Sequence, residues 1–237
     1  MLSIIYNRQD SYLDFGLVVV GTISKPSTNP VYETYNIPGR RGTVNEFQYY
    51  GDNEINVNFG FKTYENITAK KSKILNWLNS NSNELVISDD KSIFYKVNKV
   101  SVSGFDGQNI KNFSVTFSVD PFTYLQEGNI PIELTQATSI YNVRANVESN
   151  LYLKIYGVGD ITVNINSQSL ILKNVSEYIE VDSDLMDCFK KIDGQDKVVH
   201  MNDHMYSAFP VLNIGENIIS WSGNVEKILI IPRWCCR

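Results

Sequence analysis

A strict alternation of apolar and polar residues recurs along the chain and constrains its fold more than any other feature. Within residues 54–62 the apolar positions are Ile55, Val57, Phe59 and Phe61. Within residues 112–119 they are Phe113, Val115, Phe117 and Val119. Because side chains two residues apart lie on the same face of a strand, both segments are predicted to be strands with one buried face and one wet face.

Segments rich in turn-forming residues separate further strands, which are predicted over residues 151–155 and 161–165. These segments are Asp106-Gly107, residues 157–160, Asn166-Ser167 and residues 222–224. Short, evenly spaced strands joined by such turns are typical of antiparallel sandwiches and barrels. We therefore expect a mainly β fold.

One segment departs from the alternation. Its apolar residues follow the spacing of a single helical face and are Ile67, Ile74, Leu75 and Leu78. Lysines occupy the other faces, and an Asn/Ser tract at residues 79–83 ends the pattern. This predicts one helix over residues 65–79, with Trp77 packing at its edge and the helix capping an open end of the sheet.

The length of 237 residues allows one or two domains. The strand over residues 112–119 is predicted to stop at Asp120-Pro121, because proline has no N–H for a strand ladder and restricts the residue before it. A new series of strands starts at Ile130. We expect a first domain over residues 1–127, a β-sandwich or barrel with the helix, and a second domain over residues 128–237, a β-sandwich.

Composition narrows the function classes. The formal net charge of −5 argues against a protein that binds nucleic acid through its phosphate backbone. The content of 43% hydrophobic residues indicates a globular chain. We expect no membrane span and no secretory leader. The cysteines Cys188, Cys235 and Cys236 form an odd set with two adjacent members, so folding in a reducing compartment is expected rather than a disulfide framework.

Two groups of side chains raise the possibility of a metal site. His200 and His204 are four residues apart, but their surroundings are not helical, and a third ligand would have to come from Asp203, Asp196 or Cys188. The more ordinary interpretation is a loop, and we expect no metal.

The acidic run Asp182, Asp184 and Asp187 has the alternation of a calcium loop without its central glycine and final glutamate. We expect a solvated turn entering a short helical segment, capped by Asp182 or Ser183. Asp89-Asp90 is similarly expected to form a hairpin tip.

Nothing indicates a catalytic site or a cofactor. Cys188 could pair with a later histidine as a nucleophile, but no local pattern supports this, and an inert cysteine is expected. The chain has no G-x-S-x-G, Walker A or G-x-G-x-x-G motif. We expect a protein that is not an enzyme.

A short basic turn is the most unusual segment. Pro38, Gly39, Arg40, Arg41 and Gly42 lie between strands predicted over residues 31–36 and 44–50. Pro38-Gly39 fixes a turn, and the two glycines bracket two arginines. Arginine side chains bind carboxylates or phosphates through bidentate hydrogen bonds. We expect a loop that contacts a neighbouring chain, the alternative being a solvated hairpin tip.

In the order and spacing of its segments the chain resembles the distal tail (Dit) family of long, non-contractile-tailed phages of Gram-positive bacteria. The resemblance covers nearly the whole chain. Its segments are Pro38 to Gly42, residues 55–61, 74–78, 85–87, 94–97, 115–124, 209–217 and 230–234. Arg41 departs from the family pattern, in which an acidic residue is common at this position.

The resemblance implies a structural protein of the virion, at the distal tip of the tail, that is assembled in the host cytoplasm. It implies a homo-hexameric ring built by residues 1–127, with a galectin-like β-sandwich over residues 128–237. The implied partners are the major tail tube protein, a tail-tip or tail-lysin protein and receptor-binding proteins. Genome DNA would pass through the lumen without specific binding. The particle could be an infectious phage or a tail-like bacteriocin.

Two other functions are compatible with the residues. Aromatic side chains of the second half could stack on sugars in a carbohydrate-binding module, and they are Tyr141, Tyr152, Tyr156, Tyr178, Trp221 and Trp234. A cell-wall glycosidase or peptidase assembled from scattered carboxylates is the third possibility.

Overall fold

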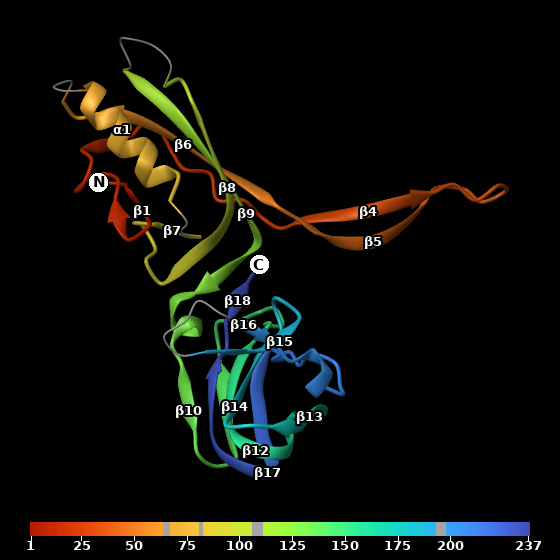
Figure 1. Ribbon diagram of the computed structural model, residues 1–237. Helices are drawn as coiled ribbons and strands as arrows, with labels where there is room; N and C mark the ends of the chain where they lie inside the picture. The colour runs from red at the N-terminus through yellow and green to blue at the C-terminus, as the bar shows by residue number, and fades with distance from the viewer. Residues whose placement is uncertain (64–66, 81–82, 106–110, 193–197) are drawn as a thin grey trace. The chain divides into compact units, whose positions relative to one another are not determined.

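The structure is a computed structural model that describes residues 1–63, 67–80, 83–105, 111–192 and 198–237 (Figure 1). The predicted turn at Asp106-Gly107, and Asp196, lie outside these residues. The chain divides into two compact units, Met1–Thr123 with Arg237, and Tyr124–Cys236. The fold is mainly β, as predicted. Within the described ranges, no helix has the length and apolar character that a membrane crossing requires.

The first unit contains an antiparallel sheet in the order β2-β1-β7-β8-β9-β6-β3, a helix, and a separate two-stranded sheet, β4-β5. Its elements are β1 (Ile4–Tyr6), β2 (Gln9–Asp10), β3 (Leu17–Val19), β4 (Asn29–Tyr35), β5 (Val44–Gly51), β6 (Asn53–Phe61), α1 (Ile67–Leu78), β7 (Glu84–Ile87), β8 (Ile93–Ser103) and β9 (Asn112–Leu125). Asp89-Asp90 lies in the turn between β7 and β8, where the N–H of Asp90 donates to the carbonyl of Ile87, as predicted.

The two strands with the clearest alternation pair with each other. β6 and β9 run antiparallel, from Asn53 opposite Val119 to Gly60 opposite Asn112. Their apolar side chains are buried in the core of the unit. On the wet face, polar side chains bond across the strands, as Ser114 does to Asn58 at 2.6 Å. The predicted alternation is therefore confirmed.

The predicted helix is present as α1. Ile74, Trp77 and Leu78 point into the core, which supplies most of the stabilisation of a short helix. Trp77 is buried within the core rather than at the edge, and its indole N–H donates to the carbonyl of Tyr6 at 2.6 Å.

The predicted end of a strand at Asp120-Pro121 is wrong, because β9 continues to Leu125. The pairing of β9 with β6 ends at Val119, so the missing N–H of Pro121 lies beyond that ladder. The carbonyl of Pro121 still accepts a long hydrogen bond from the side chain of Asn53, at 3.5 Å.

The second unit is built around a sheet in the order β10-β17-β12-β14-β15-β16, with β11 on β17 and β13 on β12. Its elements are η1 (Gln126–Asn129), β10 (Ile132–Leu134), β11 (Thr138–Asn142), β12 (Tyr152–Ile165), β13 (Gln168–Val175), β14 (Tyr178–Asp182), β15 (Asp187–Lys191), β16 (Val198–His200), η2 (Asn202–His204), β17 (Gly215–Ile231) and β18 (Cys235–Cys236). The predicted turn at Asn166-Ser167 joins β12 to β13.

The turns predicted at residues 157–160 and 222–224 are wrong. Each segment lies inside one long strand, β12 or β17, and the two strands pair along most of their length. Their register shifts at both segments, so the residues form β-bulges rather than turns. Glycine and polar residues serve both structures, and for that reason the sequence pattern alone did not distinguish them.

The bulged backbones approach each other closely. A Cβ atom on Gly157 would lie 2.4 Å from the carbonyl oxygen of Asn224, and one on Gly223 would lie 2.4 Å from that of Asp160. Gly223 also has a φ of +101°, a conformation that L side chains rarely adopt. Both positions therefore require glycine.

Candidate contact sites on the two units

The β4-β5 hairpin is the most exposed element of the first unit. Its strands pair from Asn29 opposite Gly51 to Tyr35 opposite Val44 and form a sheet of their own, which is seen as a long ribbon in Figure 1. Most of its residues are exposed on both faces. Because an isolated two-stranded hairpin is at best marginally stable in water, an exposed hairpin of this kind is a candidate contact surface.

One face of the hairpin carries a row of aromatic rings. Tyr32 contacts Phe47 with ring centroids 6.0 Å apart, Phe47 contacts Tyr50 at 4.9 Å, and Tyr50 contacts Phe122 at 5.3 Å. A register shift after Val31 allows Phe47 and Tyr50 to share this face. The row links the hairpin to the end of the main sheet of the unit, although Tyr32 and Phe47 remain 53% and 47% exposed.

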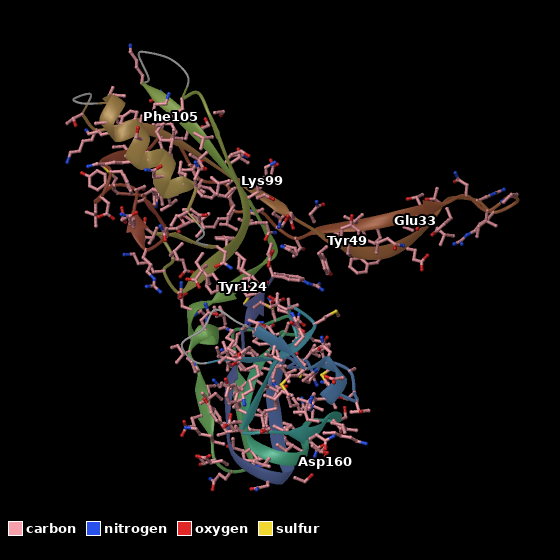
Figure 2. All side chains as sticks on the ribbon, viewed as in Figure 1. Glu33, Tyr49, Lys99, Phe105, Tyr124 and Asp160 are labelled. Carbon is pink, nitrogen blue, oxygen red and sulfur yellow. The ribbon has the colours of Figure 1, made fainter. Side chains whose placement is uncertain are left out.

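The other face carries an acidic pair. Glu33 of β4 lies directly opposite Glu46 of β5, and both are exposed (Figure 2 labels Glu33). Hydrogen bonding to Glu33, followed by burial and hydrogen bonding to Glu46, raises the pKa of Tyr35 above its ordinary value. The Tyr35 hydroxyl therefore lies beside both carboxylates.

The tip of the hairpin is the basic turn singled out in the sequence. The N–H of Arg40 donates to the carbonyl of Ile37 at 3.1 Å, which closes a turn. Gly39 and Gly42 have φ angles of +83° and +81°, so both bracketing positions favour glycine. Arg40 and Arg41 are exposed, and in the described part of the chain neither forms an ion pair. The role of Pro38, Gly39, Arg40, Arg41 and Gly42 as a contact loop stays a prediction.

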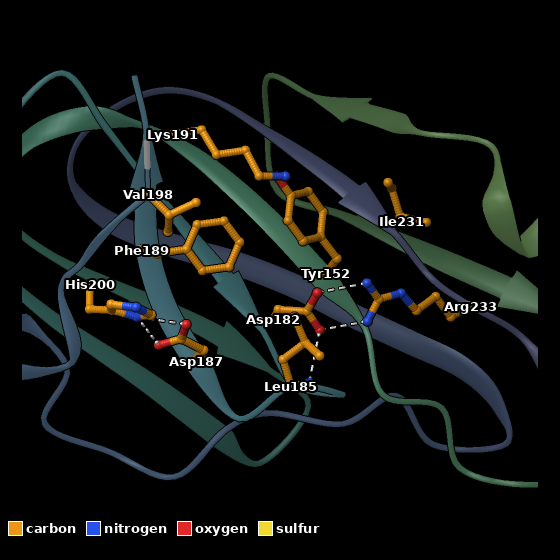
Figure 3. Close-up of a pocket in the computed structure, with 10 residues that line it drawn as sticks. All are labelled: Tyr152, Asp182, Leu185, Asp187, Phe189, Lys191, Val198, His200, Ile231 and Arg233. Atoms are coloured by element: carbon orange, nitrogen blue, oxygen red, sulfur yellow. Dashed lines mark hydrogen bonds and ion pairs between the residues drawn. The ribbon is translucent and has the colours of Figure 1, made fainter. Parts of the chain in front are cut away.

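The second unit contains a pocket of about 640 Å³ (Figure 3). Its lining combines apolar side chains with charged groups that already have partners. The lining residues are Tyr152, Asp182, Leu185, Asp187, Phe189, Lys191, Val198, His200, Ile231 and Arg233.

A buried ion pair forms one wall of this pocket. Arg233 donates to both carboxylate oxygens of Asp182, which also accepts from the N–H groups of Asp184 and Leu185. Burial alone would raise the pKa of Asp182, but the hydrogen bonds and charge of Arg233, together with the two turn N–H groups, bring it below its ordinary value. Asp182 therefore caps a turn and is charge-neutralised. The predicted solvated entry into a helical segment is wrong, because Asp182 and Ser183 are buried and the turn joins two strands.

His200 and His204 contact different partners. His200 contacts Asp187 at 2.9 Å, whereas His204 contacts the carbonyl of Lys173 at 2.8 Å. Burial tends to raise the pKa of Asp187, but hydrogen bonds from His200 and Asn202 lower it overall. No cluster of three metal-ligating side chains occurs among the residues that the structure describes.

Cys188 is buried, and burial first, then the charges of Asp187 and Asp203, raises its pKa to about 12. A thiol with this pKa is protonated at neutral pH and is a poor nucleophile. The geometry thus gives no support for a cysteine nucleophile at this position.

The aromatic side chains considered for sugar stacking are mostly unavailable. Trp234 and Tyr178 are buried, and lysine ammonium groups lie over the rings of Tyr156 and Tyr178. The rings of these two tyrosines are tilted by 41° and do not form a flat platform. Tyr141 remains 63% exposed.

The acidic pair and the aromatic row are not predicted from the sequence. Both depend on which residue of β4 faces which residue of β5, a register that the long turn and the bulge leave undetermined in sequence. The detectable signal was the concentration of tyrosine and phenylalanine in two strands that flank an unusual turn.

Comparison with known proteins agrees with this architecture. Residues 5–119 match the phage tail protein RIFT-related domain. The crystal structure of the Dit protein of phage SPP1, described as a paradigm of the hub adsorption apparatus in phages infecting Gram-positive bacteria, has a TM-score of 0.66 with this chain. The two chains are 13% identical, and the match covers 97% of each.

Two structures of the phage P2 baseplate in its activated conformation, with calcium and with strontium, have TM-scores of 0.49 and identities of 10%. These matches cover 97% of this chain and 98% and 97% of the baseplate chains. A search of curated proteins found no match.

Proposed function

We propose that the chain is a phage tail protein of the distal tail (Dit) family and that six copies of it form a ring hub at the distal end of the tail. The match of residues 5–119 to the phage tail protein RIFT-related domain supports a structural role in the virion tail. In the proposed ring, residues 1–127 form the wall, and residues 128–237 form a galectin-like domain.

The exposed β4-β5 hairpin is the observation that carries this proposal. A closed ring needs head-to-tail contacts between two different patches of each copy. The hairpin supplies a patch with aromatic rings and a basic tip, and most residues on its two faces are exposed in one chain. We infer that the loop Pro38, Gly39, Arg40, Arg41 and Gly42 contacts the neighbouring copy.

In this proposal the ring joins the major tail tube protein on one side to a tail-tip or tail-lysin protein on the other, and it can anchor receptor-binding proteins. Six copies at −5 each carry −30 per ring, which disfavours adhesion of DNA to its conduit. Assembly would take place in the cytoplasm of the host bacterium.

Electron microscopy of purified particles with a labelled antibody against this chain tests the placement. We expect label at the distal end of the tail, next to the tube. Label along the tube, on the head or on no particle would overturn the proposal. As a second arm, particles carrying Arg40→Glu and Arg41→Glu should lack a completed tail tip, although each unit of the chain stays folded.

A further inference from the structure

We propose that the acidic pair Glu33 and Glu46 of one copy receives Arg40 and Arg41 of the next copy. This inference rests on the proposed ring and identifies the two patches that its head-to-tail contact would join. The occupant of the acidic face is thus a second copy of this chain.

The acidic pair is an unfavourable arrangement in a single chain. Like charges directly opposite each other on neighbouring strands are destabilising, and Glu33 and Glu46 are in that position. Gln48 contacts Glu33 at 3.4 Å and Tyr35 bonds to both carboxylates, but these neutral groups do not remove the charge. Among the described residues no lysine or arginine pairs with either glutamate.

The basic tip carries the opposite charge, which is also without a partner in the described residues. Two arginines are held by a turn with glycines at positive φ, yet they pair with no acid in the described residues. Two guanidinium groups match two carboxylates in charge and in their ability to form paired hydrogen bonds. Because the two patches differ, copies that join them in one direction around a circle make the head-to-tail contacts that a closed ring requires.

Tyr35 adds a flat surface to the acidic face. It lies two residues from Glu33 on the same strand, so it shares that face, and it is 41% exposed. Guanidinium groups stack on aromatic rings, so an incoming arginine can contact Tyr35 and a carboxylate at the same time. Lysine would match the charge without this stacking.

Two charge-reversed variants of the full chain test the contact. The acid-reversed variant carries Glu33→Arg and Glu46→Arg, and the arginine-reversed variant carries Arg40→Glu and Arg41→Glu. The acid-reversed variant keeps a like-charged pair across the strands, so the hairpin itself is perturbed little. A matched control carries Glu216→Arg and Glu226→Arg, two exposed positions on β17 of the second unit.

Native mass spectrometry, under the conditions in which the wild-type chain forms rings, gives the readout. We expect each reversed variant alone to lose at least tenfold in ring population, whereas the control assembles like the wild type. An equimolar mixture of the two reversed variants should recover rings with three copies of each. In such a ring every tip meets a neighbour of opposite charge, because six is even.

The outcomes separate the two claims. A mixture that stays disassembled while the chain with all four substitutions assembles would mean that the contact lies within one chain, and it would overturn the inference. Normal rings from the acid-reversed variant would overturn it as well, although the ring proposal would stand. A wild-type chain that forms no ring with its tail partners would overturn both proposals.

Discussion

Arg233 places its two terminal nitrogens on the two carboxylate oxygens of Asp182, at 2.6 and 2.8 Å. The residues are 51 positions apart, and the pair fastens the segment after β17 to the end of β14. Asp182 is almost fully buried, and Arg233 is mostly buried. Since a buried charge without its partner is costly, this contact is a vulnerable point of the second unit.

Removal of one partner should therefore destabilise the unit strongly. We expect Arg233→Met to lower the free energy of unfolding by about 3 kcal/mol, because it leaves the Asp182 carboxylate buried without a counter-charge. The double variant Arg233→Met with Asp182→Leu should recover much of that loss. Urea unfolding, followed by tryptophan fluorescence, measures both. Equal losses in the single and double variants would contradict the assigned role of the pair.

The Asp182–Arg233 pair makes the free energy of unfolding depend on pH in the acid range. The pKa of Asp182 is lowered in the folded state, so its contribution is present above the unfolded pKa of about 3.9 and is lost as pH falls through the folded value. We expect the free energy of unfolding to decline as pH falls below about 4. In Asp182→Asn this decline should be shallower. An identical pH slope for both proteins would contradict the shift.

The β-bulges of β12 and β17 lead us to expect different effects on stability from substitutions of two glycines. Gly157→Ala should lower the free energy of unfolding by about 2 kcal/mol or more, because its Cβ would collide with the carbonyl of Asn224. Gly159→Ala is the matched control, since φ is +86° there but nothing lies within 4 Å of the added carbon. The control should lose about 1 kcal/mol from backbone strain alone. Thermal unfolding measures the difference, and equal losses would contradict the close approach of β12 and β17.

Thiol reactivity tests the burial of Cys188. With a pKa of about 12, on the order of one Cys188 thiol in ten thousand is ionised at pH 8. We expect a thiol-specific reagent to modify the partly exposed Cys236 of the folded protein well before Cys188. Peptide mapping after partial labelling distinguishes the sites, and the difference should vanish in denaturant. Rapid modification of Cys188 in the folded chain would show that the site is open.

The sequence predicted well those features that are written within a single segment. The alternation at residues 54–62 and 112–119 and the helical spacing before Trp77 each correspond to an observed element. Local periodicity determines which face of a segment is buried, so no distant information is needed. Glycine and proline were poor indicators of strand ends. Pro121 lies inside β9, beyond the residues that pair with β6, and Gly157 lies inside β12 at a β-bulge.

The contacts that build the candidate sites join residues from different segments and could not be predicted from local sequence patterns. Asp182 was expected to cap a helical segment in a solvated turn, whereas it is buried, and its partner Arg233 comes from the far end of the unit. The pairing of Glu33 with Glu46 depends on a register that includes a bulge. Such relationships follow from the tertiary fold, and a short-range pattern does not encode them.

The mass of the assembled particle tests the central claim most directly. Light scattering on the purified chain, together with the proposed tail tube partner where ring closure requires it, should give a species of six times 27.0 kDa for this component. A chain that remains monomeric or forms only twofold dimers under the same conditions would contradict the ring hub.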